Sequence, residues 1–392
     1  MAYLDFKVIF IVSFGCIICL HDVQGDELVS WYYHSRTYSR LCYCSIYLDS
    51  CYPNGCVSDG GCSTPLPKNY IAQYLHGKTI TVDGKLDDPA WNEVPWSATF
   101  DDVRGSSGFP KPRLSTRFKL RWDDNNLYVG LHMNVNNVWA TMTADESHLF
   151  RENAVDLFFA PDETLHNYKQ IEGNVRNATF DLSLSKAYMD GGIANEAWDS
   201  NEEKGVDHDG TINDPTDPGT FWTTEWAIPF RSLAERSTRN QSKPFDDEVL
   251  FLQFARMNQH LRVIRETYAL DSPPETDWWT WEPMGAVNLH VPSRWGLVKF
   301  SRDMDNKVFS FPRWHIYKTL FAIFDALQQY KSMNGVYSSK LNEIPVPRHV
   351  YRRRCIELPI IEIVSNGFVV TVKSRITGET GTIAQDRGVS FH

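Results

Sequence analysis

The chain carries three tryptophans within four positions, Trp278, Trp279 and Trp281. Pro273-Pro274 and Pro283 flank this run and disfavour a regular helix or a central strand, so we expect a loop that holds some of the indoles at the surface. Exposed indoles stack on flat apolar surfaces, and the C–H face of a sugar ring is a frequent partner. The alternative is structural, because Trp279 or Trp281 could fill the end of a β-sandwich.

An acidic residue lies in the middle of a hydrophobic strand. The pattern of residues 153–159 predicts a strand in which Asp156 points away from its apolar neighbours. A buried carboxylate is costly unless paired, which leaves either a salt bridge, with Arg176 or Arg256, or a concave polar site. A carboxylate in such a site can accept hydrogen bonds from two vicinal hydroxyls, which suits sugar recognition without reaction.

Asp156 and Glu172 could also be the acid and nucleophile of a glycosidase that hydrolyses O-glycosyl compounds. That mechanism needs two carboxyl groups at a fixed separation, one with a raised pKa. Among 49 acidic residues such a pair arises readily by chance, so we expect binding and no catalytic residues. The chain has no Gly-x-Ser-x-Gly setting, P-loop or dinucleotide fingerprint to support hydrolase triads or nucleotide chemistry.

Metal and cofactor signals are weaker. The acidic stretch 207–217 lacks the closing glutamate of an EF-hand, and we expect a solvated loop there. No cofactor is required, although a structural calcium ion is allowed at residues the sequence does not identify. A haem sandwich using Met133 beside His132, or Met257 near His260, is the minor alternative, because a methionine in a strand usually fills the core.

Composition limits the class of protein and of partner. The 392 residues exceed one ordinary domain, and 42% of them are hydrophobic, as in globular proteins. One main domain with appendages is the simplest organisation. The formal net charge of -10 disfavours a nucleic-acid surface. Neutral or cationic partners are expected instead.

Residues 1–25 have the features of a secretory signal peptide, with an apolar stretch from Val8 to Leu20 and a cleavage site after Gly25. We therefore predict a secreted, extracellular protein. No other segment approaches the roughly 20 apolar residues that a bilayer requires, so no membrane span is expected after signal removal.

Residues 26–75 form a cysteine-rich segment, and disulfide pairing is expected in an oxidising compartment. Up to three disulfides are possible, with open connectivity, among Cys42, Cys44, Cys51, Cys56, Cys62 and Cys355. A zinc site is the competitor, but no His pair has finger spacing. Asn177 and Asn240 begin glycosylation sequons.

Residues 76–302 form short apolar runs broken by Asp, Asn, Gly and Pro, which predicts an all-β antiparallel sandwich of two sheets. Strands with one solvent-exposed face are expected where polar and apolar residues alternate, at 117–122, 178–184 and 222–228. Strands covered on both faces are expected at 127–133, 155–159 and 249–254. Asp123 to Asn126 should form a hairpin turn.

The character changes in residues 303–392, which we expect to form a small α+β extension. Apolar residues recur at helical spacing from Tyr317 to Tyr330, and Gly335 is a natural stop. Residues 356–372 return to strand-like composition and suggest a helix-plus-hairpin unit.

Several segments, in this order and spacing, resemble the family 9 carbohydrate-binding modules, and in particular a secreted subgroup with a C-terminal helical extension. They are Ile80-Thr81-Val82-Asp83-Gly84, Leu86 to Trp91, Trp122-Asp123, Leu127-Tyr128-Val129, Glu152-Asn153, Asp156 to Phe159 and Trp226 to Phe230. The resemblance implies a jelly-roll-like sandwich that grips a sugar between two aromatic planes. Its aromatic positions match Phe150, where the family typically has tryptophan, and one of Trp278, Trp279 and Trp281. Asp156, and with weaker alignment Glu172, match polar binding positions.

Together these features predict a secreted protein that binds poly- or oligosaccharide and is associated with carbohydrate catabolism. Stacking on the aromatic planes and hydrogen bonds to carboxylates and amides would hold the sugar. The alternatives are an extracellular module that binds a secreted protein partner through the same aromatic residues, and a glycoside hydrolase-associated protein.

Overall fold

The computed structural model describes residues 62, 65–105, 108–304, 308–365 and 367–392. The predicted signal peptide and Cys42, Cys44, Cys51 and Cys56 lie outside the described residues. Cys62 and Cys355 are both disulfide-bonded, which confirms that this chain forms disulfides. The chain divides into two compact units, 1–63 and 64–392. Within the described residues, no helix is long and apolar enough to cross a bilayer.

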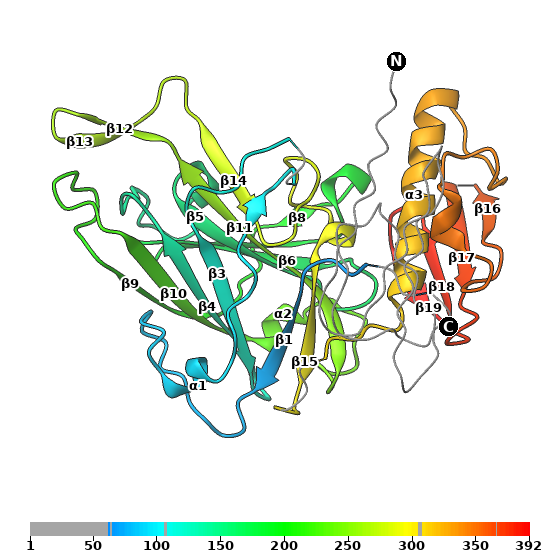
Figure 1. The fold of residues 1–392 in the computed structure, drawn as a ribbon, viewed down its shortest axis with the longest axis horizontal. Helices are drawn as coiled ribbons and strands as arrows, with labels where there is room; N and C mark the ends of the chain where they lie inside the picture. Colours follow the sequence, from blue (N-terminus) through cyan, green and yellow to red (C-terminus); the bar gives the residue numbers. More distant parts are fainter. Residues whose placement is uncertain (1–61, 63–64, 106–107, 305–307, 366) are drawn as a thin grey trace, which may run out of the picture. The chain divides into compact units, whose positions relative to one another are not determined.

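The second unit is mostly β, and its main element is one large curled sheet of 13 strands, consistent with a β-sandwich (Figure 1). The strands are β1 (Asn69–Tyr74), β2 (Asp101–Asp102), β3 (Thr116–Trp122), β4 (Asn126–Asn134), β5 (Ala154–Phe159), β6 (Tyr168–Asn174), β7 (Thr179–Leu184), β8 (Ala194–Asn195), β9 (Glu203–His208), β10 (Phe221–Pro229), β11 (Glu248–Gln259), β14 (Thr276–Thr280) and β15 (Gly296–Ser301). Their order is β8-β7-β6-β5-β11-β15-β1-β3-β4-β10-β9, and β14 pairs with β11 and β2.

Strand β1 joins two arms of this sheet. It pairs in parallel with β15, the last strand of the β8-to-β15 arm, and with β3, the first strand of the β3-to-β9 arm. The pairs within both arms are antiparallel, as predicted. The hydrogen-bonded strands therefore form one continuous path, and the jelly-roll, two-sheet description stays a prediction.

The hydrophobic core lies between the inner faces of the two arms. Phe118 of β3 stacks on Phe254 of β11 with ring centroids 4.0 Å apart, and Trp281 meets the Phe118 ring edge-on at 4.9 Å. Leu120 and Trp122 join Phe118 in this core, as the alternating pattern of β3 predicts. Aromatic packing across the two arms thus fixes how the sheet curls.

The prediction that three alternating strands each have a solvent-exposed face is wrong, because β3, β7 and β10 are buried on both faces. On β3 the outward Lys119 and Arg121 are covered by residues next to and within α1 (Pro89–Asn92). Lys119 donates to the carbonyl of Trp91 at 2.6 Å, and Arg121 donates to that of Ala90 at 2.6 Å. The predicted burial of both faces is confirmed for β5 and β11, whereas β4 keeps a half-buried outer face.

Glu225 of β10 anchors this cover to the sheet. Its carboxylate is buried and accepts hydrogen bonds from the backbone of Asp83 at 3.0 Å and Gly84 at 2.7 Å. The indole Nε1 of Trp91 donates to the second carboxylate oxygen at 2.7 Å. Gly84 has φ of 93°, and a Cβ there would lie 2.4 Å from the backbone of Val206, so the close approach requires glycine.

Shorter elements complete the main sheet. The hairpin turn at Asp123 forms as predicted, with its carboxylate accepting from the backbone of Asn125 and Asn126 at 2.7 Å. Helix α2 (Phe230–Leu233) follows β10, and β12 (Leu261–Ile264) pairs with β13 (Thr267–Leu270) in a separate two-stranded hairpin.

The C-terminal extension contains the predicted helix, α3 (Trp314–Asn334), which ends at Gly335 with φ of 78°. The helix packs on a four-stranded antiparallel sheet, orange to red in Figure 1, where a hairpin was expected. Its strands are β16 (Ile360–Val364), β17 (Gly367–Lys373), β18 (Thr380–Ala384) and β19 (Val389–Phe391).

We expect Glu225→Ala to lower the free energy of unfolding by about 2–4 kcal/mol, because it leaves buried N–H donors without an acceptor. Urea denaturation of the two proteins measures this difference. Glu203→Ala on the neighbouring strand β9 is the control, since Glu203 is exposed and should change stability by only about 0.5 kcal/mol or less. Equal effects of the two substitutions would show that Glu225 anchors nothing.

Candidate functional site

Asp156 and Glu172 lie directly opposite each other on the neighbouring strands β5 and β6. Both point to the face of the sheet away from the core, because their neighbours Val155, Leu157 and Ile171 belong to the core. Each residue is only 1% exposed. The two predicted acids are therefore brought together, but beneath the surface.

The hydrogen bonds around this pair are incomplete. Gln170 Nε2 donates to Glu172 Oε1 at 2.8 Å. Asp156 Oδ1 and Glu172 Oε2 are buried without a hydrogen-bond partner in the described structure, as is the Thr280 hydroxyl two strands from Asp156. Unsatisfied buried acceptors favour a proton on the pair.

Of the two alternatives for Asp156, the salt bridge with Arg176 or Arg256 does not form within the described residues. Arg256 lies on the core side of β11, where it donates to Thr116 Oγ1 at 3.0 Å and stacks on Trp279 at 5.0 Å. Arg176 is exposed in the turn after β6. The ionisable residue opposite Asp156 in the ladder is another acid, Glu172.

Burial raises the pKa of both carboxyl groups. The pKa of Asp156 rises to about 8, with the hydrogen bond from Gln170 opposing the shift. The pKa of Glu172 is raised well above its usual value by burial and then by the charge of Asp156. The pair therefore holds protons at neutral pH rather than two negative charges.

The tryptophan run is a strand, β14, and not the predicted loop. Pro273-Pro274 and Pro283 lie outside the strand, so they remove no hydrogen-bond donor from it. Trp281 is fully buried and Trp279 is 3% exposed, both in the core, which agrees with the structural alternative for these two residues. Trp278 is half-buried. It lies opposite Met257 of β11, which lies opposite Ala154 of β5, so Trp278 and Ala154 project on the same face of the sheet. Asp156 is two residues from Ala154 and shares that face.

Phe150 lies in a short 3-10 turn, Leu149–Arg151, just before β5. Its side chain is 38% exposed. The imidazole ring of His148 and the guanidinium of Arg151 both lie beside the Phe150 ring. Phe150 and Trp278 are thus the predicted aromatic site residues with accessible surface. Between them the sheet presents small or apolar side chains that are buried, namely Ala154, Ala255 and Met257.

Polar groups that the sequence did not single out lie beside Trp278. Gln259 and Thr276 face each other on β11 and β14, and the Thr276 hydroxyl donates to Gln259 Oε1 at 2.8 Å. Both project on the same face as Trp278, two residues along their strands. Alternation along the two strands could have identified them once β14 was known to be a strand.

The remaining sequence candidates have local partners. In the acidic stretch 207–217, the Asp209 carboxylate accepts from the backbone of Thr220 and Phe221 at 2.7 and 2.8 Å, and Asp214 accepts from Thr216 at 2.8 Å. These bonds are typical of an Asx-rich loop. Met133 is a buried core residue. Asn177 and Asn240 are exposed, and their glycosylation stays a prediction.

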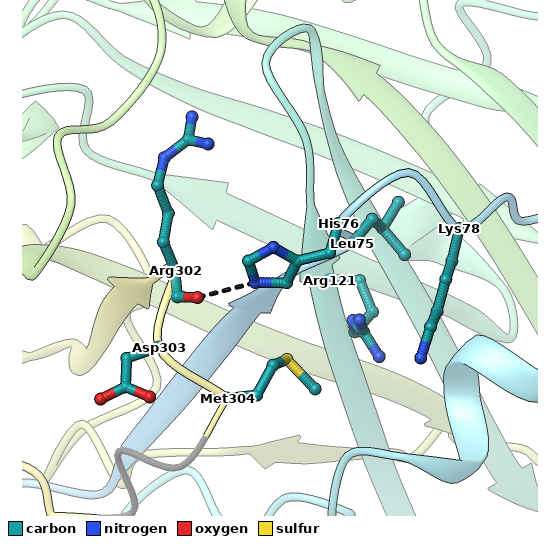
Figure 2. A pocket seen from close by; sticks show the side chains of 7 residues that line it. All are labelled: Leu75, His76, Lys78, Arg121, Arg302, Asp303 and Met304. Atoms are coloured by element: carbon teal, nitrogen blue, oxygen red, sulfur yellow. Dashed lines mark hydrogen bonds between the residues drawn. The ribbon is translucent and has the colours of Figure 1, made fainter.

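Two hollows elsewhere on this unit have charged linings. The first, of about 390 Å³, is lined by Leu75, His76, Lys78, Arg121, Arg302, Asp303 and Met304. Figure 2 shows the His76 ring nitrogen Nε2 directed at the carbonyl of Arg302, 2.7 Å away. Arg121 in this hollow pairs with Glu93 at 3.1 Å, so its charge is already matched.

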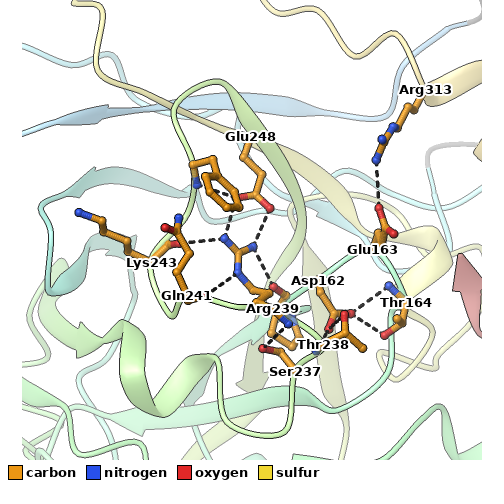
Figure 3. A network of polar contacts seen from close by, with 12 residues as sticks. Asp162, Glu163, Thr164, Ser237, Thr238, Arg239, Gln241, Lys243, Glu248 and Arg313 are labelled. Atoms are coloured by element: carbon orange, nitrogen blue, oxygen red, sulfur yellow. Dashed lines mark hydrogen bonds and ion pairs between the residues drawn. The ribbon is translucent and has the colours of Figure 1, made fainter. Parts of the chain in front are cut away.

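The second hollow, of about 450 Å³, lies where the curled sheet meets the C-terminal extension. Figure 3 shows its ion pairs: Arg239 binds Glu248 through two nitrogens at 2.6 and 2.7 Å, and Arg313 reaches Glu163 at 3.0 Å. The Asp162 carboxylate accepts from Thr238 in the same network. Only the Arg313–Glu163 pair among these links the extension to the sheet. Because the charges in this hollow are paired, the face of Phe150 and Trp278 is the stronger candidate site.

The protonated pair predicts that stability falls with rising pH. Because the folded pKa values lie above those of unfolded Asp and Glu, near 4, the stabilising contribution is complete below about pH 4 and is lost as pH rises towards about 8. Thermal unfolding between these values measures this loss. Glu172→Gln, which keeps the shape and removes one titrating group, should flatten the dependence; an equally steep dependence in this variant would contradict the assignment.

Comparison with known proteins places this geometry in a family. The model of the carbohydrate family 9 binding domain-like family matches residues 82–301. No curated protein matches the chain. Among solved structures, the chain is similar to a Bacteroides uniformis protein provisionally named as carbohydrate-binding, at 14% identity and a TM-score of 0.42, covering 60% of this chain and 100% of that one.

The chain is also similar to a family 9 carbohydrate-binding module of Caldicellulosiruptor kristjanssonii, solved with cellotriose and with glucose. Both structures share 16% sequence identity with this chain. The cellotriose complex has a TM-score of 0.35 and its alignment covers 62% of this chain and 99% of that one. The glucose complex has a TM-score of 0.36 and its alignment covers 61% of this chain and 98% of that one. The family model spans more than half of the 392 residues, and the chain therefore belongs to the carbohydrate family 9 binding domain-like family.

Proposed function

We propose that this protein binds poly- or oligosaccharide without catalysis, at the sheet face that carries Phe150 and Trp278. The observation that supports it most is that two aromatic side chains with accessible surface flank one face of the sheet, in a chain that belongs to a carbohydrate-binding family. Sugar rings stack on such planes through their C–H groups.

Polar groups next to the aromatic residues suit the hydroxyls of a stacked ring. Gln259 and Thr276 supply an amide and a hydroxyl on the Trp278 side. The buried acid pair retains protons, so it adds no negative charge beneath this face of the sheet. Phe150 and Trp278 would therefore provide affinity, and the polar neighbours would select among hydroxyl arrangements.

The burial of the acid pair favours binding over hydrolysis. A glycosidase needs both carboxyl groups at the scissile bond, one as acid and one as base or nucleophile. Asp156 and Glu172 are each 1% exposed and adjacent to each other in the ladder. Buried side chains in this position do not reach a substrate as hydrolysis would require.

We further propose that the protein acts outside the cell, in carbohydrate catabolism. The disulfide bonds of Cys62 and Cys355 support an oxidising compartment. This agrees with the secretion signal predicted from residues 1–25.

Trp278→Ala and Phe150→Ala should each weaken glycan binding about tenfold or more, which corresponds to the loss of roughly 1.4 kcal/mol of stacking and burial. Isothermal titration with cello-oligosaccharides, xylan and chitin fragments measures the affinities. Phe245→Ala is the matched control, because Phe245 is an exposed aromatic residue, at 51%, that lines the hollow beside the C-terminal extension instead.

Two results would count against the proposal. If the unsubstituted protein binds none of these glycans, the accessible aromatic residues are better explained as contacts for a secreted protein partner. If it binds them and both alanine variants bind equally well, the sugar site lies on another surface.

A further inference from the structure

A cluster of acidic side chains lies away from the proposed sugar site. Asp181 projects from β7, and Asp199 and Glu202 lie in the loop between β8 and β9. One carboxylate oxygen from each of these three residues lies within 4.8 Å of the other two. Asp145 and Glu146, in the segment before Phe150, lie near this cluster, because both are hydrogen-bonded to Thr179, whose hydroxyl donates to Glu202.

Hydrogen bonds hold these three segments together. The backbone N–H of Thr179 donates to Asp145 at 2.9 Å, and its carbonyl accepts from the backbone of Glu146 at 2.8 Å. The Thr179 hydroxyl donates to Glu202 at 2.7 Å. The backbone N–H of Ser200 donates to Asp181 Oδ2 at 2.8 Å. The carboxylates are therefore positioned before any ligand arrives.

The negative charge of the cluster is not neutralised by a nearby side chain. Within the described residues, none of its carboxylates lies within 4.0 Å of a lysine or arginine nitrogen. Lys204 is close, but its ammonium donates to the carbonyl of Ala178 at 2.7 Å and to the Thr179 hydroxyl at 2.6 Å. Burial, and then the charges of Glu202 and Asp199, raise the pKa of Asp181 to about 6.

An independent observation indicates a missing positive partner. Asp181 is 3% exposed, and its Oδ1 is buried without a hydrogen-bond partner in the described structure. A buried carboxylate oxygen with no donor costs free energy that a bound cation would recover. Asp199 is exposed and Glu202 is half-buried, so a cation can reach the cluster from solvent.

We propose that Asp181, Asp199 and Glu202 bind one calcium ion. All the available ligands are oxygens, which select hard cations over zinc or copper. Calcium accepts six to eight oxygens in flexible geometry, which suits ligands drawn from a strand and a loop, whereas magnesium requires a near-ideal octahedron. The bound ion would cross-link β7 and the loop between β8 and β9.

The test uses the full chain after treatment with EDTA. Isothermal titration with calcium chloride should give one site, and thermal unfolding should shift to higher temperature with millimolar calcium and less with magnesium. Asp199→Asn and Asp181→Asn should each weaken calcium binding by about tenfold or more, because the number of charged ligands sets the affinity. Asp214→Asn, in the Asx-rich loop 207–217, is the control and should leave calcium binding unchanged.

The proposal fails if the unsubstituted protein shows neither titration heat nor a calcium-dependent shift in unfolding temperature. It also fails if Asp199→Asn and Glu202→Gln bind calcium as tightly as the unsubstituted protein. Both residues have solvent-accessible side chains, so these two variants decide the outcome even if Asp181→Asn does not fold. If the three carboxylates only repel one another and bind no ion, the Asp199→Asn variant should be more stable than the unsubstituted protein in EDTA. The unsubstituted protein should then show no response to calcium.

Discussion

The parallel pairing of β1 with both β15 and β3 is the constraint on which the curled sheet depends. It makes the two antiparallel arms one sheet, so their inner faces can avoid water only by packing on each other, as Phe118 does on Phe254. Strand β1 precedes the region that matches the family, residues 82–301, yet it closes the fold of that region. It also brings the start of the sheet next to β15, from which the chain continues into the C-terminal extension. The position of that extension therefore follows from the closure of the sheet.

Patterns within single segments predicted the elements well, whereas burial of the outer faces could not be predicted from them. The core face of β3, the turn at Asp123 and the end of α3 at Gly335 depend on neighbours in sequence, and all three are confirmed. The polar positions of β10 looked solvent-exposed because alternation records only residue type. Their cover comes from Trp91, which is 134 positions from its partner Glu225. A local pattern holds no information about a partner so distant, which is why the exposed faces were predicted wrongly.

The candidate site shows the same division. The prolines around the tryptophan run indicated a break in regular structure, but Pro273-Pro274 and Pro283 lie outside β14 and the strand forms. Alternation along this strand places Trp279 in the core and Trp278 on the opposite face. Asp156 was predicted correctly to lie mid-strand, but its neighbour depends on the register of β5 against β6. That register places Glu172 opposite it and leaves Arg256 on the other side of the sheet. Sequence could propose the members of the site, and only strand pairing could decide which of them meet.

A buried pair of acids is a costly feature, since apolar side chains of similar size would stabilise the same position at least as well. What apolar residues could not do is accept the amide of Gln170, which donates to Glu172 Oε1 at 2.8 Å. Because Asp156 and Glu172 retain protons, the pair does not place two negative charges beneath that face of the sheet. Protonation thus limits the cost of burying the acids, and the buried side chains of Ala154, Ala255 and Met257 continue the same uncharged layer along the sheet.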